Sequence, residues 1–150
     1  NTNFLVNVLT VAPTFATTFG MVSLDEESTV NYAANANQII GGLEYGHLIL
    51  GVATTAAKLK NITASTTVNG NLTVNNFNTV VIGANSLALN GLITMGTSNA
   101  SISGGLTSNI IFGGTGAATT LPAITGNLNS SISAVGIFSR LHASSRRATS

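Results

Sequence analysis

The sequence predicts an all-β fold, and within that class a parallel β-solenoid of short strands. Three observations lead to this prediction: apolar residues recur in short runs, Gly or Asn follows these runs, and residues that favour helices are scarce. Apolar and β-branched residues in short alternating runs suit a half-buried, pleated surface. Gly and Asn adopt the backbone conformations that tight corners require. Because Glu, Lys, Gln and Arg are rare, long helices are not expected.

The predicted strands follow one another along the middle of the chain, and a Gly or Asn comes after each of them. Two of them flank an Asn-Gly corner within Thr66–Val74. Before them, the Ala- and Asn-rich stretch from Tyr32 to Gln38 is a weak helix candidate, for which an extended or turn conformation is at least as well supported. The further strands are expected at Val80–Ile82, Leu87–Leu89, Leu92–Met95, Ser101–Ser103 and Ile110–Phe112.

A solenoid is favoured over a β-sandwich, which is the alternative architecture. Corners recur too often for the longer strands of a meander. Isolated sheets normally protect their edges with Lys or Pro, whereas a solenoid has only two open ends to protect. We therefore expect a solenoid repeat region over residues 1–129 and an irregular C-terminal strand or tail over residues 130–150. The predicted core consists of Val68, Leu72, Val74, Val81, Leu87, Leu89, Leu92, Ile102, Ile110 and Phe112.

Charge is the most unusual property of the composition. Charged residues make up 6% of the chain, whereas soluble domains carry about 25%. No charged residue or His occurs from Asn61 to Ser139, although hydrophobic residues make up 44% of the chain and its net charge is +1. Disordered chains combine few apolar residues with high net charge, so disorder is not expected. A surface without repulsive charge favours association instead.

The order of several short motifs resembles a repeat found in very large secreted surface proteins of Bacteroidetes. Ser28–Tyr32 is followed by Gln38–Leu50, then by Thr66–Val74 and Leu87–Gly91, and finally by Gly113–Gly116 with Thr120–Pro122. The resemblance covers roughly residues 4–129. It implies a parallel β-helical adhesin or filament component that is extracellular or at the cell surface. The chain departs from the repeat after Asn129, where an Arg-bearing segment replaces the next apolar strand.

The acidic residues do not have the arrangement of a catalytic or metal site. Neighbouring residues of a strand point to opposite faces, so Asp25, Glu26 and Glu27 are expected to form a solvated turn rather than to converge on a cation. Glu44 and His47 are interpreted as a surface pair, because acid–base catalysis needs further positioned groups. We therefore predict that the chain is not an enzyme and has no metal or cofactor.

Three further motifs have a plain structural interpretation. Gly113–Gly116 is expected to be a corner, since a phosphate-binding loop requires a Lys that is missing here. Tyr32 and Tyr45 are expected to be packing residues rather than a platform for sugar stacking. Lys58 and Lys60 lie on one face if this segment is a strand, and they are too few for nucleic-acid binding.

The function that the sequence favours is structural. End rungs of a solenoid offer unpaired backbone groups, and an end-to-end contact that does not close produces a filament. The expected partner is a second copy of the chain, with no nucleic acid and no insertion into a membrane; no apolar run is long enough for a transmembrane helix. The alternative is an adhesin module that binds glycans or surfaces. The residues predicted to take part in assembly are Val6, Val8, Leu9, Val11, Ile132, Val135, Ile137 and Phe138.

Overall fold

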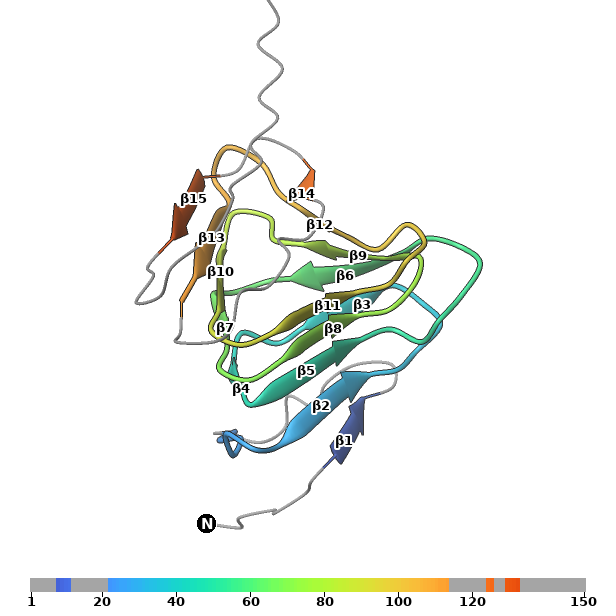
Figure 1. Cartoon of the computed structure of the whole chain (residues 1–150), viewed down its shortest axis with the longest axis horizontal. Coiled ribbons are helices and arrows are strands. Elements are labelled where there is room, and N and C mark those ends of the chain that lie inside the picture. Colours follow the sequence, from blue (N-terminus) through green and yellow to red (C-terminus); the bar gives the residue numbers. More distant parts are fainter. Residues whose placement is uncertain (1–7, 12–21, 114–123, 126–128, 133–150) are drawn as a thin grey trace, which may run out of the picture.

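The computed structural model describes residues 8–11, 22–113, 124–125 and 129–132, and these residues form a parallel β-solenoid (Figure 1). The predicted fold class is confirmed. The described residues contain no helix, and therefore none that could span a membrane. Tyr32 ends one strand and Gln38 begins the next, so the weak helix candidate between them is a corner.

Within the described residues, three five-stranded sheets make up the walls of the solenoid. Sheet A contains β1 (Val8–Val11), β2 (Thr29–Tyr32), β5 (His47–Leu50), β8 (Leu72–Val74) and β11 (Ile93–Met95). Sheet B contains β3 (Gln38–Ile40), β6 (Lys58–Ile62), β9 (Asn78–Val81), β12 (Ser101–Ser103) and β14 (Ile124–Thr125). Sheet C contains β4 (Glu44–Tyr45), β7 (Thr66–Val68), β10 (Ser86–Leu89), β13 (Asn109–Phe112) and β15 (Asn129–Ile132).

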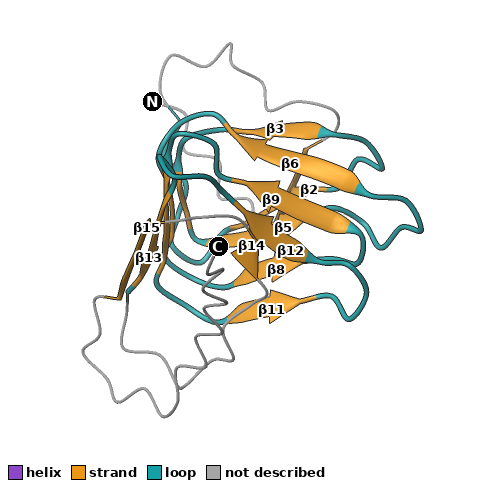
Figure 2. Ribbon diagram, turned by 90° about the horizontal axis from the view of Figure 1, so that it is seen from above, coloured by secondary structure: helices purple, strands orange, loops and turns teal. Residues whose placement is uncertain are grey.

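The chain visits sheets A, B and C in turn and then begins the next coil (Figure 2). We number the coils by these visits: β1 belongs to coil 1, β2–β4 to coil 2, β5–β7 to coil 3, β8–β10 to coil 4, β11–β13 to coil 5, and β14 and β15 to coil 6. Each strand pairs in parallel with the equivalent strand of the neighbouring coil, so that Tyr32, Leu50 and Val74 are aligned across sheet A. Successive coils are therefore spaced by about 4.8 Å.

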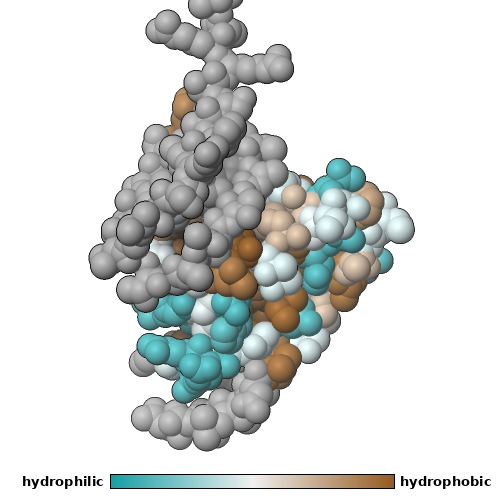
Figure 3. All heavy atoms as spheres, viewed as in Figure 1, coloured by the Kyte–Doolittle hydropathy of each residue, from teal (hydrophilic) through white to brown (hydrophobic). Residues whose placement is uncertain are grey.

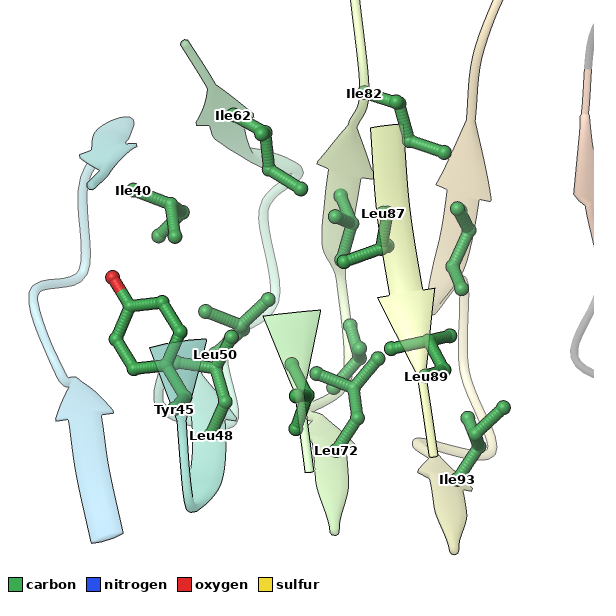
Figure 4. Packing of buried hydrophobic residues seen from close by; sticks show 14 of the residues in the cluster. Ile40, Tyr45, Leu48, Leu50, Ile62, Leu72, Ile82, Leu87, Leu89 and Ile93 are labelled. Carbon is green, nitrogen blue, oxygen red and sulfur yellow. The ribbon is translucent and has the colours of Figure 1, made fainter. Parts of the chain in front are cut away.

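The core is a column of apolar side chains enclosed by the three sheets (Figure 4). Every second residue of a strand points inward, as the pleat requires. In sheet A, Val30, Leu48 and Leu72 lie in successive coils and are buried. Eight of the predicted core residues are buried as expected: Val68, Leu72, Val74, Leu87, Leu89, Ile102, Ile110 and Phe112.

Two residues predicted for the core lie elsewhere. Val81 is on the outer side of β9, because its neighbours Val80 and Ile82 are the buried residues of this apolar run. Leu92 is 49% exposed in the corner before β11, where Ile93 is the inward-facing residue. Both errors have the same cause: an apolar run without alternation does not reveal which residues point inward.

The corner between sheets C and A is built on glycine. Gly46, Gly70 and Gly91 occupy this corner in successive coils. A Cβ atom on Gly70 would lie 2.6 Å from Nδ1 of His47 and 2.7 Å from the carbonyl oxygen of Gly46. A Cβ atom on Gly91 would collide with the carbonyl oxygen of Gly70. Glycine is thus required here because the backbones of neighbouring coils approach each other closely.

Candidate assembly surfaces

The two ends of the solenoid are formed by the outermost strands of the three sheets. Among the described residues, β1, β3 and β4 are outermost at the N-terminal end, and β11, β14 and β15 are outermost at the C-terminal end. Figure 1 shows β1 at one end of the stack, and β14 and β15 at the other. Within the described part of the chain, each of these strands has a strand neighbour on one side only. Such strand edges can pair with another chain.

The backbone of β1 has a defined orientation. The carbonyl oxygen of Val11 accepts a hydrogen bond from the amide of Ala33 in the next coil at 3.2 Å. Peptide groups alternate in direction along a strand, so the peptide groups of Val8 and Thr10 face away from β2 and toward the open edge. Both residues are exposed, and 54% of the surface of Val8 is accessible.

Four of the eight predicted assembly residues lie on outermost strands of the described solenoid. Val8, Leu9 and Val11 lie on β1, where Val11 is buried and Leu9 packs partly against the core. Ile132 ends β15 at the opposite end. Val6, Val135, Ile137 and Phe138 lie outside the described residues. The role of these eight residues in assembly remains a prediction.

A buried lysine links the coils near the N-terminal end. Lys60 is 0% exposed, and its Nζ donates hydrogen bonds to the carbonyl oxygens of Ala34 at 3.0 Å and Ala36 at 3.1 Å. A third bond reaches Oε1 of Gln38 at 2.6 Å. Gln38 Nε2 in turn donates to the carbonyl oxygen of Val11 at 3.1 Å. This hydrogen-bond chain runs through coils 3, 2 and 1, and we call Lys60 and Gln38 the lysine clamp.

Burial has a direct electrostatic consequence for the lysine clamp. Removal of the ammonium group from water, together with the smaller effect of the charge of Lys58, lowers the pKa of Lys60 to about 8. The three oxygen acceptors match the three donors of an ammonium group. Lys58 and Lys60 lie on one face of a strand, as the sequence predicts, but this face is the interior of the solenoid and not its surface.

Tyr32 and Tyr45 form a hydrogen-bonded pair in the core. Both are 0% exposed, and their rings meet edge to face with centroids 6.4 Å apart. Tyr45 O–H donates to the carbonyl oxygen of Gly41 at 2.8 Å, so Tyr32 O–H is the donor in the 2.9 Å bond between the two hydroxyls. Burial raises the pKa of both phenols. The prediction that the tyrosines are packing residues is confirmed, and the sugar-platform reading is wrong.

The acidic segment forms the solvated turn that the sequence predicts. Asp25 Oδ1 accepts a hydrogen bond from the amide of Glu27 at 2.9 Å, and the carbonyl oxygen of Asp25 accepts one from the amide of Ser28 at 3.0 Å. Asp25, Glu26 and Glu27 are all exposed. Among the described residues, no three His, Asp or Glu side chains are grouped so that they could hold a metal ion.

The two remaining sequence candidates are parts of corners or strands. Glu44 is exposed on β4, whereas His47 Nδ1 accepts a hydrogen bond from the amide of Asn71 at 2.9 Å in the next coil. His47 therefore anchors the corner between sheets C and A to the next coil. Gly113 is the first residue after β13, and its amide bonds to the carbonyl oxygen of Leu89 at 2.9 Å. Gly114, Thr115 and Gly116 lie outside the described residues.

Over the described residues 61–113 the outer surface is polar and carries no charged side chain. Teal and white areas are interspersed with brown apolar ones over the visible described surface (Figure 3). Hydroxyl and amide groups continue from coil to coil, as in the Thr79–Ser101 bond at 3.1 Å and the Asn90–Asn69 bond at 2.9 Å. Such ladders stabilise the contact between coils without introducing charge.

Comparison with known proteins gives no assignment. No family model matches the chain, and neither a curated protein nor a solved structure is significantly similar to it.

Proposed function

We propose that this chain is a structural protein, a segment of a filament or stalk that assembles by end-to-end stacking of solenoids. Its partner in this assembly is a second copy of itself. The proposal includes a location outside the cell or at the cell surface, which rests on the resemblance of its motifs to secreted surface repeats.

The observation that carries this proposal is the edge of β1 that has no strand neighbour among the described residues. β1 is aligned residue by residue with β2 in the same parallel register that β2 keeps with β5. The exposed Val8 and Thr10 direct their peptide groups away from the solenoid, as derived above. A strand of another copy that paired with β1 in the same parallel register would form hydrogen bonds with these groups. Each coil of the solenoid already pairs with the next in this way.

Adhesion to glycans is less well supported. The sequence feature in its favour was the pair Tyr32 and Tyr45, and both are fully buried. They cannot stack on a sugar in this fold.

Thr10→Pro tests the proposal. Proline removes the amide that faces the open edge, while the bonds of β1 to β2 come from the neighbouring residues. We expect Thr10→Pro to abolish concentration-dependent assembly in sedimentation and light-scattering measurements. Thr10→Val is the matched control, because it keeps the amide and the β-branched shape, and it should assemble like the unmodified chain.

Circular dichroism and thermal unfolding show whether the proline variant is still folded. If it is not, Val8→Pro replaces it, since proline is tolerated at the first residue of a strand. A folded proline variant that assembles as well as Thr10→Val would contradict the proposal.

A further inference from the structure

The outer side of sheet B carries two columns of uncharged side chains. β3, β6, β9 and β12 lie side by side in this sheet (Figure 2), and their outward residues are aligned from coil to coil. We call these residues the sheet B face. One column contains Ile39, Asn61, Val81 and Ser103, and the other contains Leu59, Thr79 and Ser101.

The sheet B face has no titratable group. The two lysines of β6, Lys58 and Lys60, lie on the inner side of that strand. The other two sheets do have titratable groups on their outer sides, because His47 lies there in sheet A and Glu44 in sheet C. Among the described residues, the sheet B face is therefore the sheet face on which two copies meet without charge repulsion.

The sheet B face also exposes large apolar side chains. Ile39 is 52% exposed and Leu59 is 41% exposed, and they lie on the neighbouring strands β3 and β6. Contact with a partner would remove this apolar surface from water, which favours association. The other exposed large apolar residues of the described chain lie on the end strand β1 or in corners: Val8, Val52, Leu92 and Leu106.

The repeat of the sheet B face indicates which partner fits it. Its columns advance by about 4.8 Å per coil, and a hydrogen bond of 3.1 Å joins the hydroxyl groups of Thr79 and Ser101 along one column. A partner contacts successive coils in the same way only if its own surface has this repeat. The sheet B face of a second copy has it. Where end-to-end stacking continues the coils, the sheet B face continues from copy to copy as well.

We infer that the sheet B face is a lateral interface, through which two filaments of this chain lie side by side. The inference rests on the proposed end-to-end assembly and goes beyond it, because stacking uses strand edges and leaves the sheet B face uncovered. One copy contributes few side chains to the contact, so two isolated copies are held together only weakly. Along a filament every copy repeats the contact, and many weak contacts together give a stable pair of filaments.

Leu59→Lys tests the inference, because it places an ammonium group on the sheet B face of every copy. Unmodified filaments should lie in pairs in electron micrographs, whereas Leu59→Lys filaments should be single and equally long. Leu92→Lys is the matched control. Leu92 is 49% exposed, but it lies in the corner between sheets C and A, which does not border sheet B. Leu92→Lys filaments should be paired like the unmodified ones.

Circular dichroism shows whether Leu59→Lys is folded. If it is not, Ile39→Lys replaces it, since Ile39 is the more exposed of the two residues. Single filaments of the unmodified chain would overturn the lateral interface, and so would Leu59→Lys filaments that pair like those of Leu92→Lys. End-to-end assembly would stand in both cases. If the unmodified chain forms no filaments, the proposed function fails and the lateral interface fails with it.

Discussion

Two regions of the same solenoid are held together by different chemistry. Between residues 29 and 60 the interior contains the tyrosine pair and the lysine clamp, whereas between residues 61 and 113 the buried side chains are mostly aliphatic. The connection between sheets A and B differs as well: it spans residues 51–57 in coil 3 but only 75–77 in coil 4. In the charge-free region, Asn and Ser side chains satisfy the corner carbonyls.

The comparison shows that the same backbone geometry can satisfy its corner carbonyl groups with two kinds of hydrogen-bond donor. Corner carbonyls that face the next coil need a donor, because an unsatisfied buried polar group costs about 1–3 kcal/mol. The first region supplies an ammonium group from Lys60, and the second supplies side-chain amides and hydroxyls.

The largest effect is expected where the coils approach most closely. Gly91→Ala places a Cβ atom against the carbonyl oxygen of Gly70, and backbone must move to relieve the contact. We expect the free energy of unfolding to fall by about 3 kcal/mol, measured by urea denaturation. Gly105→Ala is the matched control, with nothing within 4 Å of the added atom, and should change stability by less than about 0.5 kcal/mol. Equal effects at the two glycines would contradict the close-contact account.

Removal of the lysine clamp should have the next largest effect. Lys60→Met fills a similar volume but leaves the carbonyl oxygens of Ala34 and Ala36 without their donor. The expected loss is about 2 kcal/mol, again by urea denaturation. Lys58→Met, on the same strand but only half-buried, should lose less than about 1 kcal/mol. The clamp has no stabilising role if the two variants are equally stable.

The tyrosine pair should contribute less, because hydrogen bonds between neutral groups are weaker. Tyr45→Phe removes the bonds to Gly41 and Tyr32 and should reduce the free energy of unfolding by about 1 kcal/mol. Because the two hydroxyls share one hydrogen bond, the Tyr32→Phe/Tyr45→Phe double variant should lose less than the sum of the single losses. Strict additivity would show that the hydroxyls act independently.

The response of stability to pH tests the lysine clamp and the tyrosine pair without any substitution. The pKa of Lys60 is lowered from 10.5 to about 8 in the folded chain, so between these values the unfolded chain binds more protons and stability rises with pH. The pKa of both tyrosines is raised above 10.0, so above pH 10 the folded chain binds more protons and stability falls. Unfolding experiments across this range should give a maximum near pH 10. In Lys60→Met the rise should be absent and the fall should remain.

The fold was predictable because its signals are local. Alternation in Thr66–Val68 and Leu72–Val74, with Asn69 and Gly70 between them, specifies two strands and a tight corner. The inward direction of Val80 rather than Val81 was not predictable, because three consecutive apolar residues fit either orientation.

The lysine clamp was not predicted for a different reason. A Lys at an interior strand position is normally too costly to bury, so the sequence alone favours the surface. Only the structure shows the three oxygens from Ala34, Ala36 and Gln38 that converge on Lys60. Of the predicted assembly residues, Val8, Leu9 and Val11 lie on β1 and Ile132 lies on β15, and their role in assembly remains a prediction.

Electron microscopy of the purified chain across a concentration series tests the central claim most directly. The account predicts filaments that lengthen with concentration and give an axial layer line at about 4.8 Å, because the spacing between coils continues across each joint. Short single rods at every concentration would contradict it, and so would filaments without this axial spacing.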